Sequence, residues 1–102
     1  MTKKINLNTV VIDCNSFLIQ ALKKLNKSDI KILFVKEKKK IVGTLTDGDI
    51  RRILLNSNQT KISIKDKYNK KFLFFLEKNF DYKRANKIMI KKEVNVAPIL
   101  NS

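Results

Sequence analysis

Apolar residues recur at intervals of three and four in two separate stretches of the first half of the chain, and this spacing predicts two helices. The first helix follows Asn15 and Ser16, either of which could cap it. The second begins at Asp47 and runs to about residue 57. The apolar faces are formed by Leu18, Ala21, Leu22 and Leu25 in the first helix and by Ile50, Ile53 and Leu54 in the second.

Runs of β-branched and apolar residues predict three strands around the first helix. The run TVVI at 9–12 precedes that helix, and the runs IKILFVKE at 30–37 and IVGTLT at 41–46 follow it. The short segment EKKK joins the last two runs, so we expect them to form a β-hairpin. The predicted order over residues 1–57 is therefore strand, helix, strand, strand, helix, which is a mixed α/β (α+β) arrangement.

The sequence also contains an internal repeat at an offset of 64 residues. ALKKLNKSDIKILFV from Ala21 aligns without a gap to ANKIMIKKEVNVAPI from Ala85, and Val35 then falls on Ile99. Apolar positions keep their places through a strand, a helix and a second strand, as a duplicated unit predicts. The predicted organisation is a first unit, a polar linker and a partial second unit at residues 1–57, 58–63 and 64–102. Because the second unit would lack its last strand and helix, we expect the chain to be a piece of a longer protein.

Composition removes several classes of function. The 102 residues have 43% hydrophobic content, which suffices for a modest core, and no window resembles a membrane span or a signal peptide. We therefore expect a soluble, cytoplasmic protein without a membrane partner. With one cysteine, Cys14, and no histidine, neither an internal disulfide nor the usual metal and nucleophile sites are favoured.

The formal net charge of +14 suggests a polyanionic partner, but the residue types do not favour nucleic acid. Nucleic-acid surfaces tend to use arginine forks and stacked aromatic rings. Here arginine occurs only at positions 51, 52 and 84, and the lysines are scattered over every segment. Specific nucleic-acid binding is therefore not expected.

The candidate chemistry lies at the junction of a strand and a helix, in the string VGTLTDGDIRR. Thr46 or Asp47 can cap the helix, and the acids at 47 and 49 suit its positive end, so these residues could serve stability alone. They could also bind a ligand, because a carboxylate accepts two hydrogen bonds from a vicinal diol and a hydroxyl at a helix start can contact phosphate.

This string in its strand-to-helix context resembles the CBS domain, which is named for cystathionine β-synthase. Gly43 in the strand, Thr46 and Asp49 carry the resemblance, and IRRIL follows them. The form TDGDIRR is similar to CBS pairs attached to sugar nucleotidyltransferases and sugar-phosphate isomerases. The resemblance implies tandem CBS units with the second incomplete, a homodimer, and a catalytic domain in the same polypeptide, for which a sugar nucleotidyltransferase is our hypothesis.

The resemblance also implies a regulatory ligand, either AMP, ATP or another nucleotide, bound in a cleft between the two copies. The Thr46 hydroxyl would contact phosphate, the Asp49 carboxylate would hold the ribose, and one of the two arginines at 51 and 52 would take a phosphate while the other faces solvent. Because Asp47 and Asp49 add negative charge there, a ligand with few or no phosphates is compatible with this turn. The predicted ligand-binding residues are Thr46, Asp47, Asp49, Arg52, Ile12, Ile30, Ile32, Val96 and Pro98.

Two other functions remain open at this point. Asp47 and Asp49 form a DxD pattern that could hold a metal in an enzyme, but no base or further ligand lies in a recognisable relation to them, so catalysis is not expected. A purely structural dimerisation module without a ligand is the stronger alternative, since an unfinished sheet leaves an edge that another copy could cover.

Overall fold

A computed structural model describes residues 9–28, 30–57 and 61–100 of the chain. It consists of two compact units, Met1–Lys70 and Lys71–Ser102, which are described separately below. No helix in the described part of the chain has the length and apolar content that a bilayer span requires.

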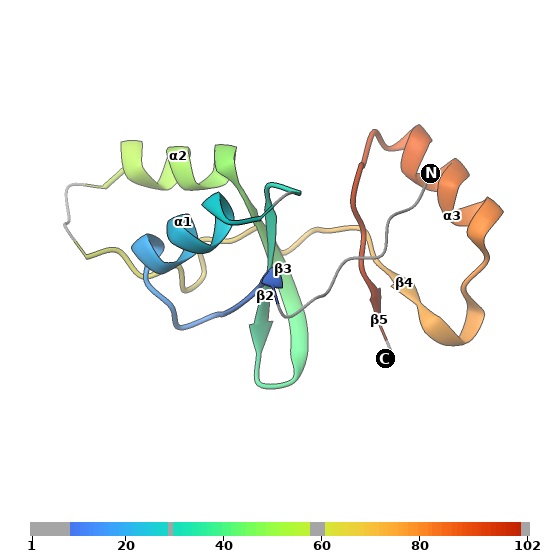
Figure 1. Ribbon diagram of the computed structural model, residues 1–102, viewed down its shortest axis with the longest axis horizontal. Helices are drawn as coiled ribbons and strands as arrows, with labels where there is room; N and C mark the ends of the chain where they lie inside the picture. The colour runs from blue at the N-terminus through green and yellow to red at the C-terminus, as the bar shows by residue number, and fades with distance from the viewer. Residues whose placement is uncertain (1–8, 29, 58–60, 101–102) are drawn as a thin grey trace. The chain divides into compact units, whose positions relative to one another are not determined.

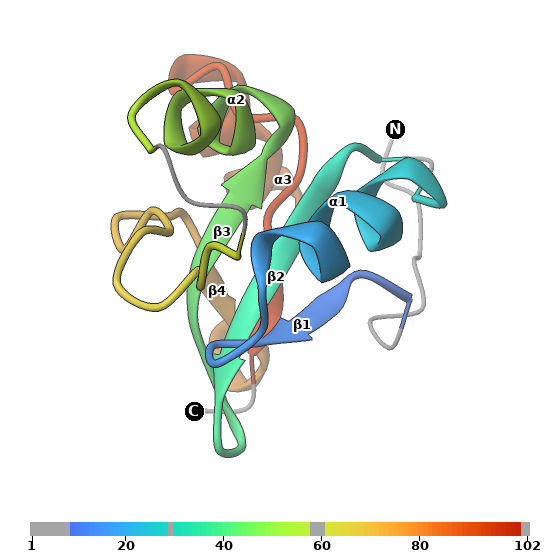
Figure 2. The same cartoon turned by 90° about the vertical axis from the view of Figure 1, so that its left-hand side faces the viewer.

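The first unit has the predicted order of elements (Figure 1). β1 (Val11–Asp13) pairs in parallel with β2 (Ile32–Glu37), and β2 pairs antiparallel with β3 (Lys40–Thr46) in a sheet of order β1-β2-β3. The β2–β3 hairpin, with β1 beside β2, is clear in Figure 2. The helices are α1 (Leu18–Asn26) and α2 (Asp47–Leu55). The mixed α and β fold class is confirmed.

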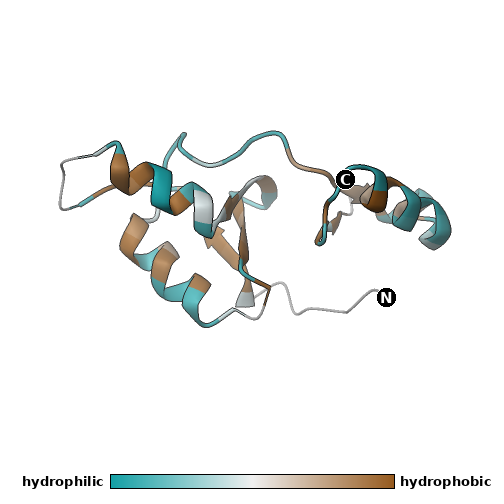
Figure 3. Cartoon of the chain, turned by 90° about the horizontal axis from the view of Figure 1, so that it is seen from above, coloured by the Kyte–Doolittle hydropathy of each residue, from teal (hydrophilic) through white to brown (hydrophobic). Residues whose placement is uncertain are grey.

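Both helices cover the same face of this sheet. Paired strand residues share a face, and the pairs Leu33 with Leu45 and Ile12 with Val35 point into the core. Leu18, Ala21 and Leu25 of α1 and Ile50 of α2 pack in the same cluster. Figure 3 shows apolar segments alternating with polar ones along both helices, as the helical period requires. The opposite face carries the pairs Ile32 with Thr46 and Phe34 with Thr44.

The start of α1 differs from the prediction. The N-cap is Phe17, whose N–H donates to the Gln20 side-chain oxygen at 2.8 Å, so the assignment of the cap to Asn15 or Ser16 was wrong. The reason is a contact distant in sequence. The N–H of Leu18 donates to the carbonyl oxygen of Ile62 (2.6 Å), and the N–H of Ile64 donates to that of Ser16 (3.0 Å). The segment at 62–64 therefore satisfies one of the free N–H groups at the start of the helix, that of Leu18.

Residues 61–70 pack within the first unit. Ile62, Ile64 and Tyr68 are buried in its core cluster, and Asn69 pairs with Thr44 at the edge of β3. The predicted linker at 58–63 lies partly outside the described residues, and the boundaries of the two repeats stay a prediction.

The position of Tyr68 explains the glycine in β3. A Cβ added at Gly43 would lie 2.6 Å from the carbonyl oxygen of Asn69 and 2.8 Å from Cε1 of Tyr68, with Cδ1 of the same ring closer still. Carbon atoms in ordinary contact stay about 3.5–4.0 Å apart. Only glycine therefore lets this ring lie against the backbone of β3.

The second unit consists of β4 (Phe75–Leu76), the 3₁₀ turn η2 (Glu77–Asn79), α3 (Tyr82–Lys91) and β5 (Ile99–Leu100). β4 and β5 pair in parallel, so this unit has the same strand, helix, strand connection as β1, α1 and β2. Asp81 caps α3 by accepting a hydrogen bond from the N–H of Lys83 at 3.1 Å.

The repeat alignment is correct at β4 and α3 but off by one residue at β5. Val11 pairs with Phe34, and its counterpart Phe75 pairs with Ile99, so Ile99 corresponds to Phe34 and the predicted match to Val35 was wrong. The loops after the two helices differ in conformation. Among the described residues of these loops, the left-handed one is Lys31 in the first (φ 54°), five residues after α1 ends, and Glu93 in the second (φ 56°), two residues after α3 ends.

Candidate functional site

The candidate site begins where β3 ends and α2 starts. Thr46 is the N-cap of α2, and its hydroxyl accepts a hydrogen bond from the N–H of Asp49 at 3.2 Å. In return, Oδ2 of Asp49 accepts one from the N–H of Thr46 at 2.9 Å. This reciprocal capping box follows from the three-residue spacing of a hydroxyl and a carboxylate, and it holds both side chains in place.

Each acid of this turn is paired with an arginine. Nη2 of Arg51 lies 2.9 Å from Oδ2 of Asp47, and both side chains are well exposed. Nη2 of Arg52 donates to Oδ1 of Asp49, whose side chain is only 14% exposed. Two guanidinium groups therefore balance the negative charge that the two carboxylates add to this turn. This removes the argument for a ligand with few phosphates.

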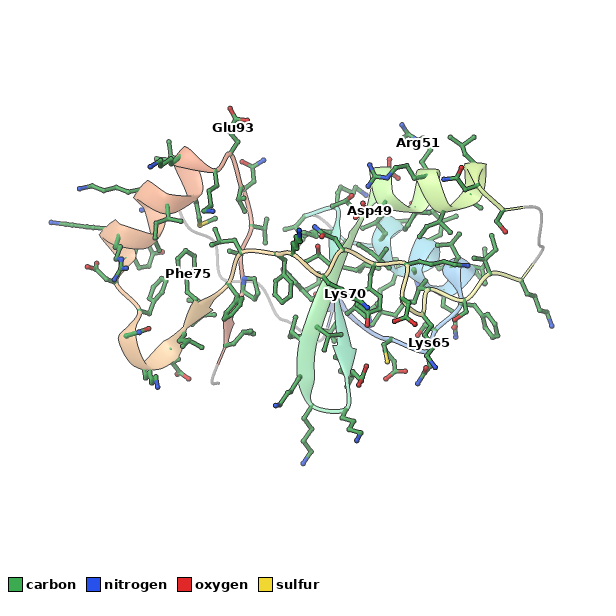
Figure 4. All side chains as sticks on the ribbon, turned by 180° about the vertical axis from the view of Figure 1, so that it is seen from behind. Asp49, Arg51, Lys65, Lys70, Phe75 and Glu93 are labelled. Carbon is green, nitrogen blue, oxygen red and sulfur yellow. The ribbon has the colours of Figure 1, made fainter. Side chains whose placement is uncertain are left out.

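A hollow of about 330 Å³ opens beside this junction, entirely within the first unit. This volume lies at the small end of the range of small-molecule sites. Its lining residues are Asp49, Arg52, Ile53, Asn56, Ser57 and Lys67. Asp47 and Arg51 do not line it, and Figure 4 shows Arg51 on the opposite side of α2 from Asp49.

Four lining residues were not among the predicted ligand-binding residues: Ile53, Asn56, Ser57 and Lys67. Asn56, the C-cap of α2, stands seven residues after Asp49, so helical spacing places the two on one face, and this signal could have been used. Lys67 gave no signal, because it belongs to the segment at 61–70, which reaches the hollow only through its packing on the first unit.

The predicted apolar residues are divided between the two faces of the first sheet. Ile32 pairs directly with Thr46 and is half-buried on the face opposite the helices. Ile30 is also half-buried, and its N–H donates to the Ser28 hydroxyl at 3.3 Å. Ile12 instead lies in the core, only 6% exposed, on the face that α1 and α2 cover. The structure thus groups Ile32 with Thr46 and not with Ile12.

The remaining predicted residues belong to the second unit. Val96 is half-buried, and Pro98 is buried with its carbonyl oxygen accepting a hydrogen bond from the N–H of Phe75 at 3.0 Å. Their ligand-binding role stays a prediction.

Metal and thiol chemistry find no support in the described residues. No three acidic, cysteine or histidine side chains come together among them, and Asp47 and Asp49 are paired with arginines. Cys14 is buried, and burial, with the carboxylate of Asp13 nearby, raises the pKa of its thiol. A raised pKa disfavours the reactive thiolate.

The model of the CBS domain family matches residues 1–56, more than half of the chain. This chain belongs to the CBS domain family. Among curated proteins, none matches it.

Several solved structures share the fold of this chain. Staphylococcus aureus OpuCA is 15% identical to this chain with a TM-score of 0.73, and the match covers 89% of this chain and 74% of OpuCA. The CBS domain pair of MJ0100, solved with 5-methylthioadenosine and S-adenosyl-L-methionine, is 22% identical with a TM-score of 0.70. The match covers 91% of this chain and 76% of the MJ0100 chain. CBSX2, solved with AMP, is 16% identical with a TM-score of 0.73, and the match covers 93% of this chain and 75% of CBSX2. At these identities the likeness shows the fold, while the ligands are those of the other proteins.

Proposed function

We propose that this CBS chain is a regulatory module that binds an adenosine nucleotide, such as AMP or ATP, and does not itself catalyse a reaction. The observation that carries the proposal is the position of the Asp49 carboxylate, which is held by the capping box with Thr46 and forms part of the wall of the hollow. The AMP of CBSX2 supports this ligand class, and the two ligands of MJ0100 support its adenosine part.

The chemistry of the junction suits a nucleotide. The Asp49 carboxylate can accept two hydrogen bonds from the ribose diol, and the Thr46 hydroxyl at the start of α2 can contact a phosphate. Ile32, which pairs with Thr46 and is half-buried, offers apolar surface for the base. We assign ribose recognition to Asp49 and phosphate recognition to Thr46.

We further propose that the module acts in the cytoplasm as a homodimer and regulates a catalytic domain within the same polypeptide. A sugar nucleotidyltransferase is the candidate for that domain, and only the string TDGDIRR supports it.

Calorimetric titration of AMP and ATP into wild type and Asp49→Asn tests the ligand proposal. Losing the charged acceptor should weaken binding by about tenfold or more, since hydrogen bonds to charged groups contribute about 1.5–3 kcal/mol. Asp66→Asn is the matched control, because Asp66 also pairs with a basic side chain, Lys70 at 3.3 Å, but lies outside the hollow. Its positive φ of 60° suits asparagine, so this variant should bind as wild type does. Equal binding by wild type and Asp49→Asn would refute the assigned role.

The alternative, a dimerisation module without a ligand, is favoured by exposed apolar side chains on the two helices. Ile19 of α1 and Leu54 and Leu55 of α2 are 58%, 49% and 78% exposed. Apolar side chains in this position suit a second copy of the chain. Absence of AMP and ATP binding, together with a dimer in sedimentation that Leu55→Lys dissociates, would select this alternative.

A further inference from the structure

We propose that the outer face of α3 binds the surface of an anionic phospholipid bilayer. Its lysines contact the phosphates of the headgroups, and Ile90 enters the apolar layer beneath them. This inference goes beyond the nucleotide function proposed above and does not depend on it. The expected absence of a membrane partner rested on the lack of a membrane span, and a contact at the membrane surface needs none.

The outer face of α3 carries two neighbouring rows of side chains. One row is Lys83, Lys87 and Lys91, all of which are exposed. Residues four apart on a helix are neighbours, so these positive charges follow one another at intervals of about 6 Å. The row beside it contains Tyr82 and Ile90, which are 52% and 77% exposed. The outer face is therefore cationic with a large apolar side chain among the charges.

The inner face of the helix is a different surface. It holds Ala85, which is buried, and Ile88 and Met89, which are half-buried. In Figure 4, nitrogen-tipped side chains project from α3 away from the strands of the second unit. The apolar inner face thus serves the folding of the unit, and the charged outer face remains available to a partner.

The stability of α3 does not explain its charges. Cations oppose the helix dipole near the N-terminus, where Lys83 and Arg84 lie, and like charges four residues apart destabilise a helix. In α2, by contrast, Arg51 and Arg52 pair with acids four and three residues earlier. α3 contains no acidic residue, and none of its four cations is in an ion pair with another described residue. This unbalanced charge favours an anionic partner outside the chain.

The apolar side chain on this face favours a bilayer over a nucleic acid. Ile90 is aliphatic, so it cannot stack on a base as an aromatic ring does. At a membrane, an aliphatic side chain can enter the apolar layer while lysine stems lie beside it and their ammonium groups stay at the phosphates. The amphipathic ring of Tyr82 suits the same interface. The helix also has three lysines and one arginine, whereas nucleic-acid surfaces tend to use arginine forks.

Paired variants separate the charge of this face from its apolar part. Lys83→Gln/Lys87→Gln removes two charges from α3, and the control Lys39→Gln/Lys40→Gln removes two exposed charges from the β2–β3 hairpin of the first unit. Ile90→Gln removes the apolar side chain, and Ile90→Leu keeps it. Because all these positions are exposed, each variant should keep the circular dichroism spectrum of wild type. Lys83→Ala/Lys87→Ala, with a stronger helix former, replaces the glutamine variant if that one melts early.

The test is sedimentation of the full chain with vesicles of phosphatidylcholine, alone or with about one third phosphatidylglycerol. Wild type should bind only the anionic vesicles in about 0.1 M salt and leave them in about 1 M salt, where the screening length falls from about 10 Å to about 3 Å. Lys83→Gln/Lys87→Gln should weaken binding by about 25-fold, since each basic side chain near such a surface contributes about fivefold in affinity. Lys39→Gln/Lys40→Gln should weaken it by less than about threefold. Ile90→Gln should weaken binding by about fivefold or more, and Ile90→Leu should stay within about twofold of wild type.

Failure of wild type to bind the anionic vesicles in low salt would overturn the inference. An equal fall in the two charge variants would also overturn it, because net charge and not this face would then govern binding. A single-stranded DNA oligonucleotide is titrated in parallel. If Ile90→Gln binds the vesicles as wild type does, and Lys83→Gln/Lys87→Gln loses binding to the DNA, the face binds nucleic acid and the bilayer is the wrong partner. None of these outcomes bears on nucleotide binding, which the titrations of AMP and ATP test separately.

Discussion

Replacing Gly43 by alanine should be among the most damaging single-methyl changes in this protein. The new Cβ would lie 2.6 Å from the Asn69 carbonyl oxygen and 2.8 Å from Cε1 of Tyr68, both well inside contact distance. Tyr68 is only 8% exposed and packs in the core cluster, so its ring has little room to retreat. The segment carrying Tyr68 and Asn69 must therefore move away from β3.

The magnitude follows from what that movement breaks. Thr44 and Asn69 exchange two backbone hydrogen bonds of 2.9 Å each, which contribute about 0.5–1.5 kcal/mol apiece. Partial exposure of Tyr68 adds about 1.5–3 kcal/mol, the usual contribution of a large buried side chain. The expected loss is thus about 2.5–6 kcal/mol, against a total stability of about 5–15 kcal/mol for a chain of this size.

Urea unfolding followed by circular dichroism measures this loss, and Gly48→Ala is the control. A Cβ at Gly48 meets nothing closer than the Thr46 hydroxyl at 3.8 Å, and Gly48 lies in the first turn of α2 with no positive φ. Alanine there should be neutral or stabilise the chain by up to about 1 kcal/mol. The double variant Gly43→Ala/Tyr68→Ala should lose less than the sum of its parts, because the ring clash is absent. A Gly43→Ala protein within about 0.5 kcal/mol of wild type would refute the packing of Tyr68 against β3.

Three further predictions concern stability and reactivity. Thr46→Ala removes the hydroxyl that accepts from the Asp49 N–H, so urea unfolding should show a loss of about 0.5–2 kcal/mol, and no loss would mean that the capping box does not stabilise α2. Cys14 should react with a thiol reagent far more slowly in the native than in the urea-unfolded protein at pH 8, because burial raises the pKa of its thiol. Since the folded state holds this proton more tightly, the free energy of unfolding should fall as the pH rises past the ordinary thiol pKa. Cys14→Ser should flatten that fall. In hydrogen exchange, amides of α3 should exchange faster than those of α1, because Ala85 alone is buried on α3 whereas three residues are buried on α1, and equal protection would contradict this ranking.

The sequence by itself determined the elements and the centre of the candidate site. Helical and strand periods come from which face of each element is buried, and they predicted the order of β1, α1, β2, β3 and α2. The capping box between Thr46 and Asp49 spans three residues of one turn, so its spacing was visible in the sequence. The repeat predicted the strand, helix, strand order of the second unit for the same reason, because apolar positions keep their places when a unit is duplicated.

Only the tertiary structure decided what residues 61–70 do. This segment satisfies the start of α1 through Ile62 and Ile64, places Tyr68 against Gly43, and brings Lys67 to the hollow. These contacts join residues more than twenty positions apart or depend on the exact path of a loop. No helical or strand period in the sequence indicates such contacts. The one-residue shift at β5 has the same origin, because strand register is set by hydrogen bonding across the sheet and by the loop that delivers the strand. The ion pairs of Asp47 with Arg51 and of Asp49 with Arg52, by contrast, have the local helical spacing of four and three residues and could have been predicted from the sequence.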